Sequence, residues 1–136
     1  MKKTLLGFES LNTDLASLFL RLIYGSLFVH YGYTKFISYD EILPQFPDII
    51  GIGSKFSFIL VIFAELICGF LVTIGYLTRL AIIPIFITMI VAYFLAHAND
   101  EFQAKTLPFV FLLLSFVIFI LGSGKYSIDK VTWKAS

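Results

Sequence analysis

The stretch Phe56–Tyr76, FSFILVIFAELICGFLVTIGY, decides the fold of this chain. A helix needs about 20 residues to cross the apolar core of a bilayer, which is about 30 Å thick, and this stretch is long enough. Because every backbone N–H and C=O must be paired inside lipid, the stretch is predicted to be a helix. One carboxylate, Glu65, stands near its centre. We therefore expect a membrane protein, in which polar groups inside apolar stretches are the main clue to function.

Three further apolar stretches lie at about residues 15–36, 80–98 and 104–121, the last lengthened by its first few residues. Of the 136 residues, 59% are hydrophobic and 14% are charged, which leaves room for a single transmembrane domain over residues 1–136. The period-2 alternation of a membrane β-barrel is absent. The sequence therefore predicts an all-α protein, an integral membrane four-helix antiparallel bundle.

Composition also narrows the classes of function. The net charge is +1 and no basic stripe is present, so nucleic acid is not an expected partner. The single cysteine, Cys68, excludes an internal disulfide and a CxxC redox pair. The two histidines stand on different stretches without a ligand spacing, so no metal or haem site is predicted. With no cofactor motif in the chain, any electron transfer would need a quinone or another subunit.

Lysine and arginine residues predict the orientation, because they are enriched in cytoplasmic segments. One side of the predicted bundle carries Lys2, Lys3, Arg79, Lys125, Lys130 and Lys134, and the other carries Lys35, Lys55 and Lys105. This split places both termini in the cytoplasm. We expect the protein to lie in a bacterial inner membrane and to be surrounded by lipid. Its oligomeric state is left open, and a homo-oligomer is one possibility.

Two charged residues lie deep inside the predicted spans. Arg21 shares one helical stripe with Ser17, Gly25, Gly32 and Lys35, and an arginine facing lipid would be costly, so it should face the bundle. Glu65 must be paired or protonated at mid-membrane. Counted from the outer ends of two antiparallel helices, the two residues differ in depth by about one turn. We therefore predict that Arg21 and Glu65 form a buried ion pair.

Four residues are candidates for ligand binding. His30, Lys35 and His97 gather toward the outer half of the predicted bundle, with Glu65 one or two turns below them. A lysine and two imidazoles can donate hydrogen bonds to carbonyl or oxyanion oxygens. The same residues can also have purely structural roles. Arg21 and Glu65 would then hold two helices together, Lys35 would extend its charge to the membrane interface, and His97 would be a polar group at a helix end.

The motifs around these residues resemble those of the DoxX family. They are LRLIYG at 20–25, HYGYTK at 30–35, FAELICG at 63–69, GYLTR at 75–79, MIVAYF at 89–94 with His97, and GSGKYSID at 122–129. The resemblance implies a four-helix integral membrane protein linked to redox chemistry. Some relatives are membrane subunits of thiosulfate:quinone oxidoreductase, and others assemble with soluble redox partners.

Three functions remain open from the sequence. The first is a membrane subunit of a redox complex, in which the outer half of the bundle binds a quinone head group or a small anion. The second is a small proton-coupled transporter in which Glu65 titrates. The third is a non-catalytic scaffold for partner proteins. Whether the chain is itself an enzyme is not decided by its residues.

Overall fold

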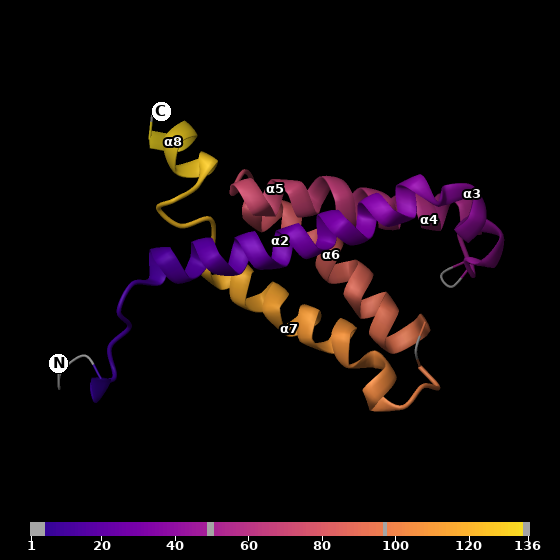
Figure 1. Ribbon diagram of the computed structural model, residues 1–136, viewed down its shortest axis with the longest axis horizontal. Coiled ribbons are helices and arrows are strands. Elements are labelled where there is room, and N and C mark those ends of the chain that lie inside the picture. Colours follow the sequence, from indigo (N-terminus) through magenta and orange to yellow (C-terminus); the bar gives the residue numbers. More distant parts are fainter. Residues whose placement is uncertain (1–4, 49–50, 97, 135–136) are drawn as a thin grey trace.

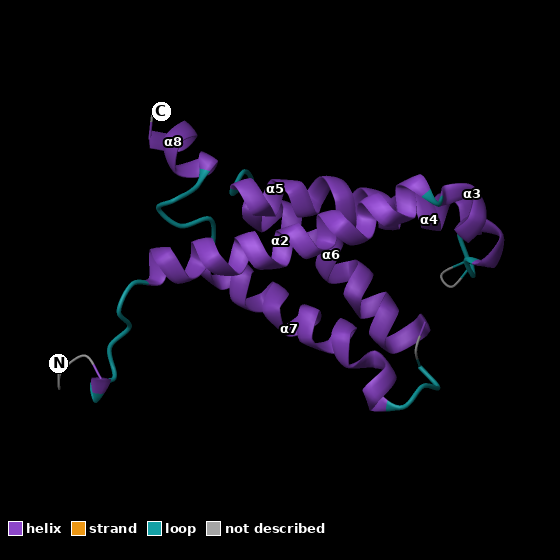
Figure 2. Cartoon of the chain, viewed as in Figure 1, coloured by secondary structure: helices purple, strands orange, loops and turns teal. Residues whose placement is uncertain are grey.

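The computed structural model describes residues 5–48, 51–96 and 98–134. Within them the protein is all-helical, without strands (Figure 2). Four of its helices are long and apolar enough to span a membrane. This confirms the predicted fold class. The spans are α2 (Thr13–Ile37), then α4 (Ser54–Ile62) continued by η2 (Phe63–Cys68) and α5 (Gly69–Ile74), then α6 (Thr78–Val91) continued by η3 (Ala92–Ala96), and finally η4 (Phe102–Lys105) with α7 (Thr106–Leu121).

The ends of the bundle differ in what connects the spans. We call the end that holds Thr13 and Leu121 the tail side, and the end that holds Ile37 and Ser54 the loop side (Figure 1). On the tail side, a tight turn joins α5 to α6, and α8 (Ile128–Lys134) follows α7. On the loop side, α3 (Tyr39–Ile42) and η1 (Leu43–Gln45) lead toward α4.

Glycines let the first two spans pack closely and antiparallel. A Cβ added to Gly25 would come within 2.8 Å of the carbonyl oxygen of Gly69, and one added to Gly32 would come within 2.5 Å of the backbone nitrogen of Leu66. Small residues allow such close approach of helices in membranes, where van der Waals packing replaces the hydrophobic drive. These two contacts fix the register of α2 against η2 and α5.

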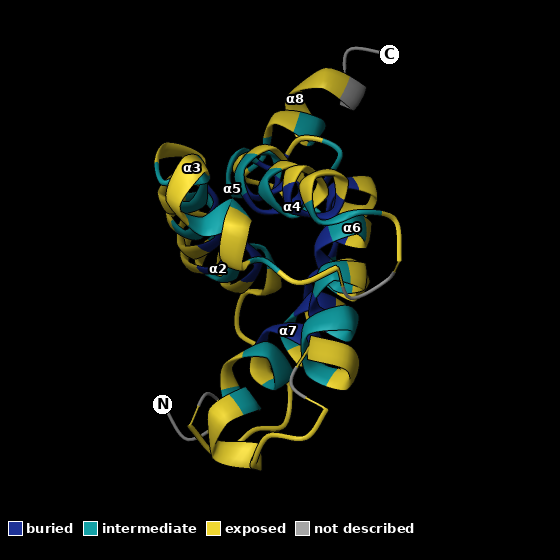
Figure 3. Cartoon of the chain, turned by 90° about the vertical axis from the view of Figure 1, so that its right-hand side faces the viewer, coloured by how far each residue is buried: buried dark blue, intermediate teal, exposed yellow. Residues whose placement is uncertain are grey.

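The four spans form two pairs that cross at an angle. In Figure 1, α2 runs beside α4 and α5, whereas α6 and α7 lean away from them toward the loop side. The core between the pairs includes Tyr24, Phe28, Val72, Ile85 and Phe111. Exposed residues lie on the outer faces of the helices (Figure 3). Many of them are large and apolar, as suits helices in contact with lipid.

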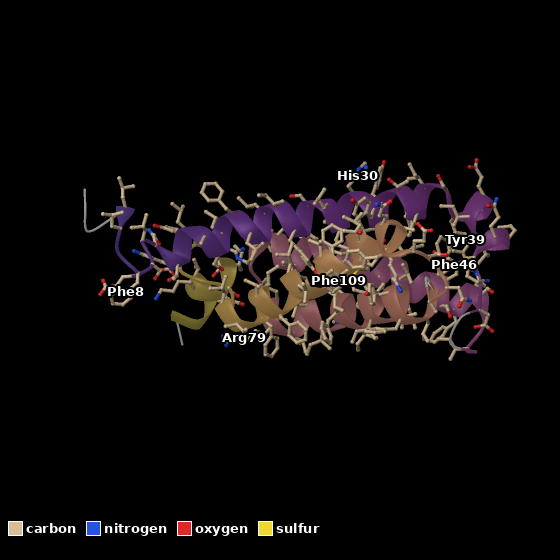
Figure 4. The ribbon with its side chains drawn as sticks, turned by 90° about the horizontal axis from the view of Figure 1, so that it is seen from below. Phe8, His30, Tyr39, Phe46, Arg79 and Phe109 are labelled. Carbon is tan, nitrogen blue, oxygen red and sulfur yellow. The ribbon has the colours of Figure 1, made fainter. Side chains whose placement is uncertain are left out.

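Aromatic side chains hold residues 38–48, which we call the loop-side segment, against the second span. The rings of Tyr39 and Phe58 stack with centroids 5.4 Å apart, and Phe46 packs on Phe58 from the other part of the segment at 4.8 Å. Tyr39 and Phe46 lie near each other at the loop-side end in Figure 4. The segment is therefore held on α4 by ring packing.

Candidate ligand-binding site

A salt bridge joins the first two spans within the bundle. The Lys35 Nζ lies 2.7 Å from Glu65 Oε2 and donates a hydrogen bond to it. Glu65 is 5% exposed, whereas Lys35 stands in the last turn of α2 and is partly exposed. The Gly32–Leu66 contact brings the two side chains to the same level, because Gly32 lies about one turn before Lys35 and Leu66 directly follows Glu65. A carboxylate in this position needs such a partner, because an isolated buried charge is very costly.

The salt bridge stands in the wall of a cavity of about 460 Å³ on the loop side. All four spans contribute to the wall, and Phe46 and Pro47 of the loop-side segment join them. Lys35 and Glu65 are the charged members of an otherwise mainly apolar lining. The lining residues are Phe28, Tyr31, Lys35, Phe46, Pro47, Ser57, Leu60, Val61, Glu65, Ile87, Thr88, Met89, Val91, Ala92, Ala96, Leu107, Pro108 and Phe111.

Two turns of π-helix border this cavity. One is η2, which carries Glu65, and the other is η3, from which Ala92 and Ala96 face the cavity. Single π-helical turns inside α-helices are rare and are often found at functional sites. Here both occur where the two helix pairs separate, and one of them presents the carboxylate.

The predicted Arg21–Glu65 ion pair is wrong. Glu65 pairs with Lys35, and the Arg21 guanidinium instead donates to the backbone carbonyls of Val72, Thr73 and Tyr126. The prediction assumed that the first two spans end level on the outer side. They do not, because Leu66 lies about 18 Å along its helix from Ser54, while the facing Gly32 lies only about 8 Å from Ile37.

The two predicted histidines are not part of the described cavity wall. His30 is exposed and points away from the other helices (Figure 4). Its place on α2 explains this, since it is nearly opposite the stripe that contacts the second span. His97 lies outside the described residues. The structure therefore brings together Lys35 and Glu65 of the four predicted site residues.

Arg21 belongs to a separate polar cluster on the tail side. It is 1% exposed and links the end of α5 to the segment after α7. Asp129 accepts hydrogen bonds from the backbone N–H groups of Leu77 and Thr78 at the start of α6, and from the Ser123 hydroxyl. A carboxylate at a helix N-terminus is favourable for the helix dipole. This cluster joins the end of α5 and the start of α6 to the segment after α7, and a second pocket of about 310 Å³ lies against Thr78, Ser123 and Asp129.

Two other features bear on what the site could hold. Among the described residues, no group of three or more His, Cys, Asp or Glu side chains could bind a metal ion. Ser57, which is not among the predicted site residues, also lines the cavity and is 7% exposed. Its spacing from Glu65, two helical turns on one span, was the sequence signal that could have identified it.

The helices and the paired charges define a small integral membrane protein of four spans with a polar site inside the bundle. The chain belongs to the DoxX family, whose model matches residues 16–98. It is similar to an uncharacterized membrane protein of Mycobacterium tuberculosis, Rv3486, with 31% identity over 132 residues that cover 82% of this chain and 77% of that protein. No solved structure matches the chain.

Proposed function

We propose that this protein is a membrane subunit of a redox complex and that its loop-side cavity binds a quinone head group. The observation that carries the proposal is the Lys35–Glu65 salt bridge in the wall of a mainly apolar cavity. Ligand sites are typically of this kind, with apolar walls and a few placed polar groups. The link of the DoxX family to redox and quinone chemistry in membranes supports the same function.

The donor set fits a carbonyl oxygen. A lysine ammonium has three N–H donors, and one of them is directed at Glu65 Oε2. The others can donate to a ligand, while Glu65 holds the ammonium in place. Tyr31 and Phe111 are aromatic members of the same wall, and aromatic side chains suit the packing of a flat ring.

A bound quinone would supply the two-electron acceptor chemistry that the chain itself lacks. The described residues contribute binding and orientation, and the apolar wall limits the access of water. The electrons must come from a partner protein, soluble or in the membrane, that carries its own redox centre. In this proposal the complex is the oxidoreductase, and this chain is its quinone-binding part.

Binding of decylubiquinone to the protein in lipid nanodiscs tests the proposal. We expect Lys35→Met to weaken binding about tenfold or more, because a charge-assisted hydrogen bond is lost. Lys55→Met is the matched control, since Lys55 is an exposed loop-side lysine that does not line the cavity. Each variant must first show the helical spectrum of the wild type.

Two results would reject the quinone function. One is a wild-type protein that binds neither decylubiquinone nor thiosulfate, which would leave the scaffold function if a stable protein partner copurifies. The other is equal binding by wild type and a folded Lys35→Met variant. Thiosulfate binding without quinone binding would point to a small anion as the ligand instead.

A further inference from the structure

The hydroxyl of Ser57 has an unusual position for a buried polar group. The residue is 7% exposed, and its Oγ has no hydrogen-bond partner within the described part of the chain. Buried polar side chains are nearly always hydrogen-bonded, so an exception calls for a water or a ligand. Ser57 lines the cavity that also holds Lys35 and Glu65.

Other hydroxyl groups on the spans do not share this position. Thr73, Thr88 and Ser115 each donate to the carbonyl oxygen four residues earlier, which is the usual arrangement for a hydroxyl in a helix. For Ser57 that carbonyl belongs to Gly53, and only the backbone N–H of Ser57 donates to it. The Ser57 hydroxyl therefore has no partner in the described part of the chain, although its residue lines the cavity.

We propose that Ser57 is a second polar contact for the ligand of this cavity, and that the ligand is a ring with two carbonyl oxygens on opposite sides. This inference rests on the proposed quinone function. Lys35 donates to one oxygen and Ser57 donates to the other. The ring lies between them, against the apolar wall.

The spacing of the two donors supports a ligand of this shape. Ser57 and Glu65 are eight residues apart on the second span, or about 12 Å along its axis, and the 2.7 Å contact with Glu65 places the other donor, Lys35 Nζ, near the level of Glu65. A hydrogen bond covers about 3 Å at each end, which leaves roughly 6 Å between the acceptor atoms of the ligand. Two C=O groups of about 1.2 Å on opposite corners of a six-membered ring place their oxygens roughly 5 Å apart. The oxygens of a small oxyanion share one central atom and are too close together to reach both donors.

Ser57→Ala tests the contact directly in the full-length protein in nanodiscs. The variant should bind decylubiquinone about three- to tenfold more weakly than wild type, as expected for one lost hydrogen bond. Its melting temperature without ligand should be unchanged or higher, because the substitution removes a buried hydroxyl that lacks a partner. Ser26→Ala, at an exposed serine of α2 away from the cavity, should change neither quantity.

A second ligand separates a two-point contact from a general effect of the substitution. The second ligand is a phenol with the ring substituents of decylubiquinone but with one oxygen in place of its two carbonyl oxygens. It should bind equally to wild type and Ser57→Ala, because the charged donor, Lys35, binds its one oxygen. An equal loss for both ligands would overturn the two-oxygen geometry. A lowered melting temperature of ligand-free Ser57→Ala would overturn the idea that the hydroxyl serves the ligand.

Failure of this inference differs from failure of the proposed function. If decylubiquinone binds to wild type and binds more weakly to Lys35→Met but equally to Ser57→Ala, the quinone function stands and the role of Ser57 is rejected. If decylubiquinone does not bind to wild type, both are rejected.

Discussion

At the scale of single residues, the Lys35–Glu65 pair explains how two charges can lie within a bundle surrounded by lipid. Their 2.7 Å contact gives each charge a partner, and Glu65 depends on it more because its side chain is 7% exposed against 29% for that of Lys35. Breaking a buried pair is costly because the remaining charge is left uncompensated. Replacing both partners with apolar groups is often tolerated.

This difference gives a prediction for stability. Lys35→Met should lower the free energy of unfolding by about 2–4 kcal/mol, and the double variant Lys35→Met/Glu65→Leu should recover most of that loss. The measurement is denaturant unfolding in detergent micelles, with Lys55→Met as the control that changes little. A double variant as unstable as Lys35→Met would show that the lone carboxylate is not the cause. A folded double variant also provides a binding control that lacks both charges.

At the scale of helices, close packing of the first two spans sets which residues meet. Gly32 against Leu66 brings Lys35 level with Glu65, and Gly25 against Gly69 and Thr73 brings Arg21 to the end of α5. The register thus separates the two polar sites, one at the cavity and one on the tail side. Interactions within each site then stabilise that register.

The loss of stability caused by replacing a contact glycine with alanine should depend on the space available for the added Cβ. Gly32→Ala should destabilise the protein by about 1–3 kcal/mol or more, because its Cβ would meet the backbone of Leu66 at 2.5 Å. Gly69→Ala should cost less, since its nearest neighbour, the Cβ of Phe28, would lie 3.0 Å away. Thermal unfolding in detergent measures the ranking. A reversed ranking would contradict the observed register.

The tail-side cluster should hold the segment after α7 in place. Arg21→Met removes the hydrogen bond to the Tyr126 carbonyl, so trypsin should cut after Lys125 or Lys130 several times faster than in wild type. Arg79→Met is the comparison, because exposed Arg79 donates to Phe119 and Ile120 within α7 and not to this segment. Equal cleavage in wild type and Arg21→Met would remove the proposed role of Arg21.

At the scale of the whole molecule, the apolar stretches were sufficient to predict four helices, because only a helix pairs the backbone of such a stretch within lipid. The second span ends at Ile74 and not at Tyr76, since Gly75 adopts a left-handed conformation with φ 75° and caps the helix. The closeness of the first two spans was also indicated by the small residues on α2. Their register was not, because it depends on where the outer ends of the helices lie relative to each other.

The candidate site was predictable in part for the same reason. The sequence placed Lys35 and Glu65 in one half of the bundle, but level helix ends favoured Arg21 as the partner of Glu65. His30 was predicted at the correct height but faces outward, because it lies on the side of α2 opposite the second span. Ser57 was missed because a serine in a helix usually bonds to its own backbone, and sequence alone does not show that this one does not.

The fold also predicts the membrane topology. The start of α2 and the helix α8 lie at the tail side, so the two terminal segments should be on one face of the membrane (Figure 1). A thiol reagent that cannot cross the membrane should label Ser10→Cys and Asp40→Cys from opposite sides, and the charge distribution predicts that Ser10 is cytoplasmic. Labelling of both cysteines from one side would contradict four membrane crossings. Buried Cys68 can be replaced by Ala as background.

Quinone binding between Lys35 and Ser57 is tested most directly by a crystal structure of the protein grown with decylubiquinone. We expect ring density in the loop-side cavity, with one oxygen within about 3 Å of Lys35 Nζ and the other within about 3 Å of Ser57 Oγ. The Lys35–Glu65 salt bridge should persist beside it. A cavity filled by a lipid chain at saturating quinone, or a quinone bound elsewhere on the protein, would contradict quinone binding at this site.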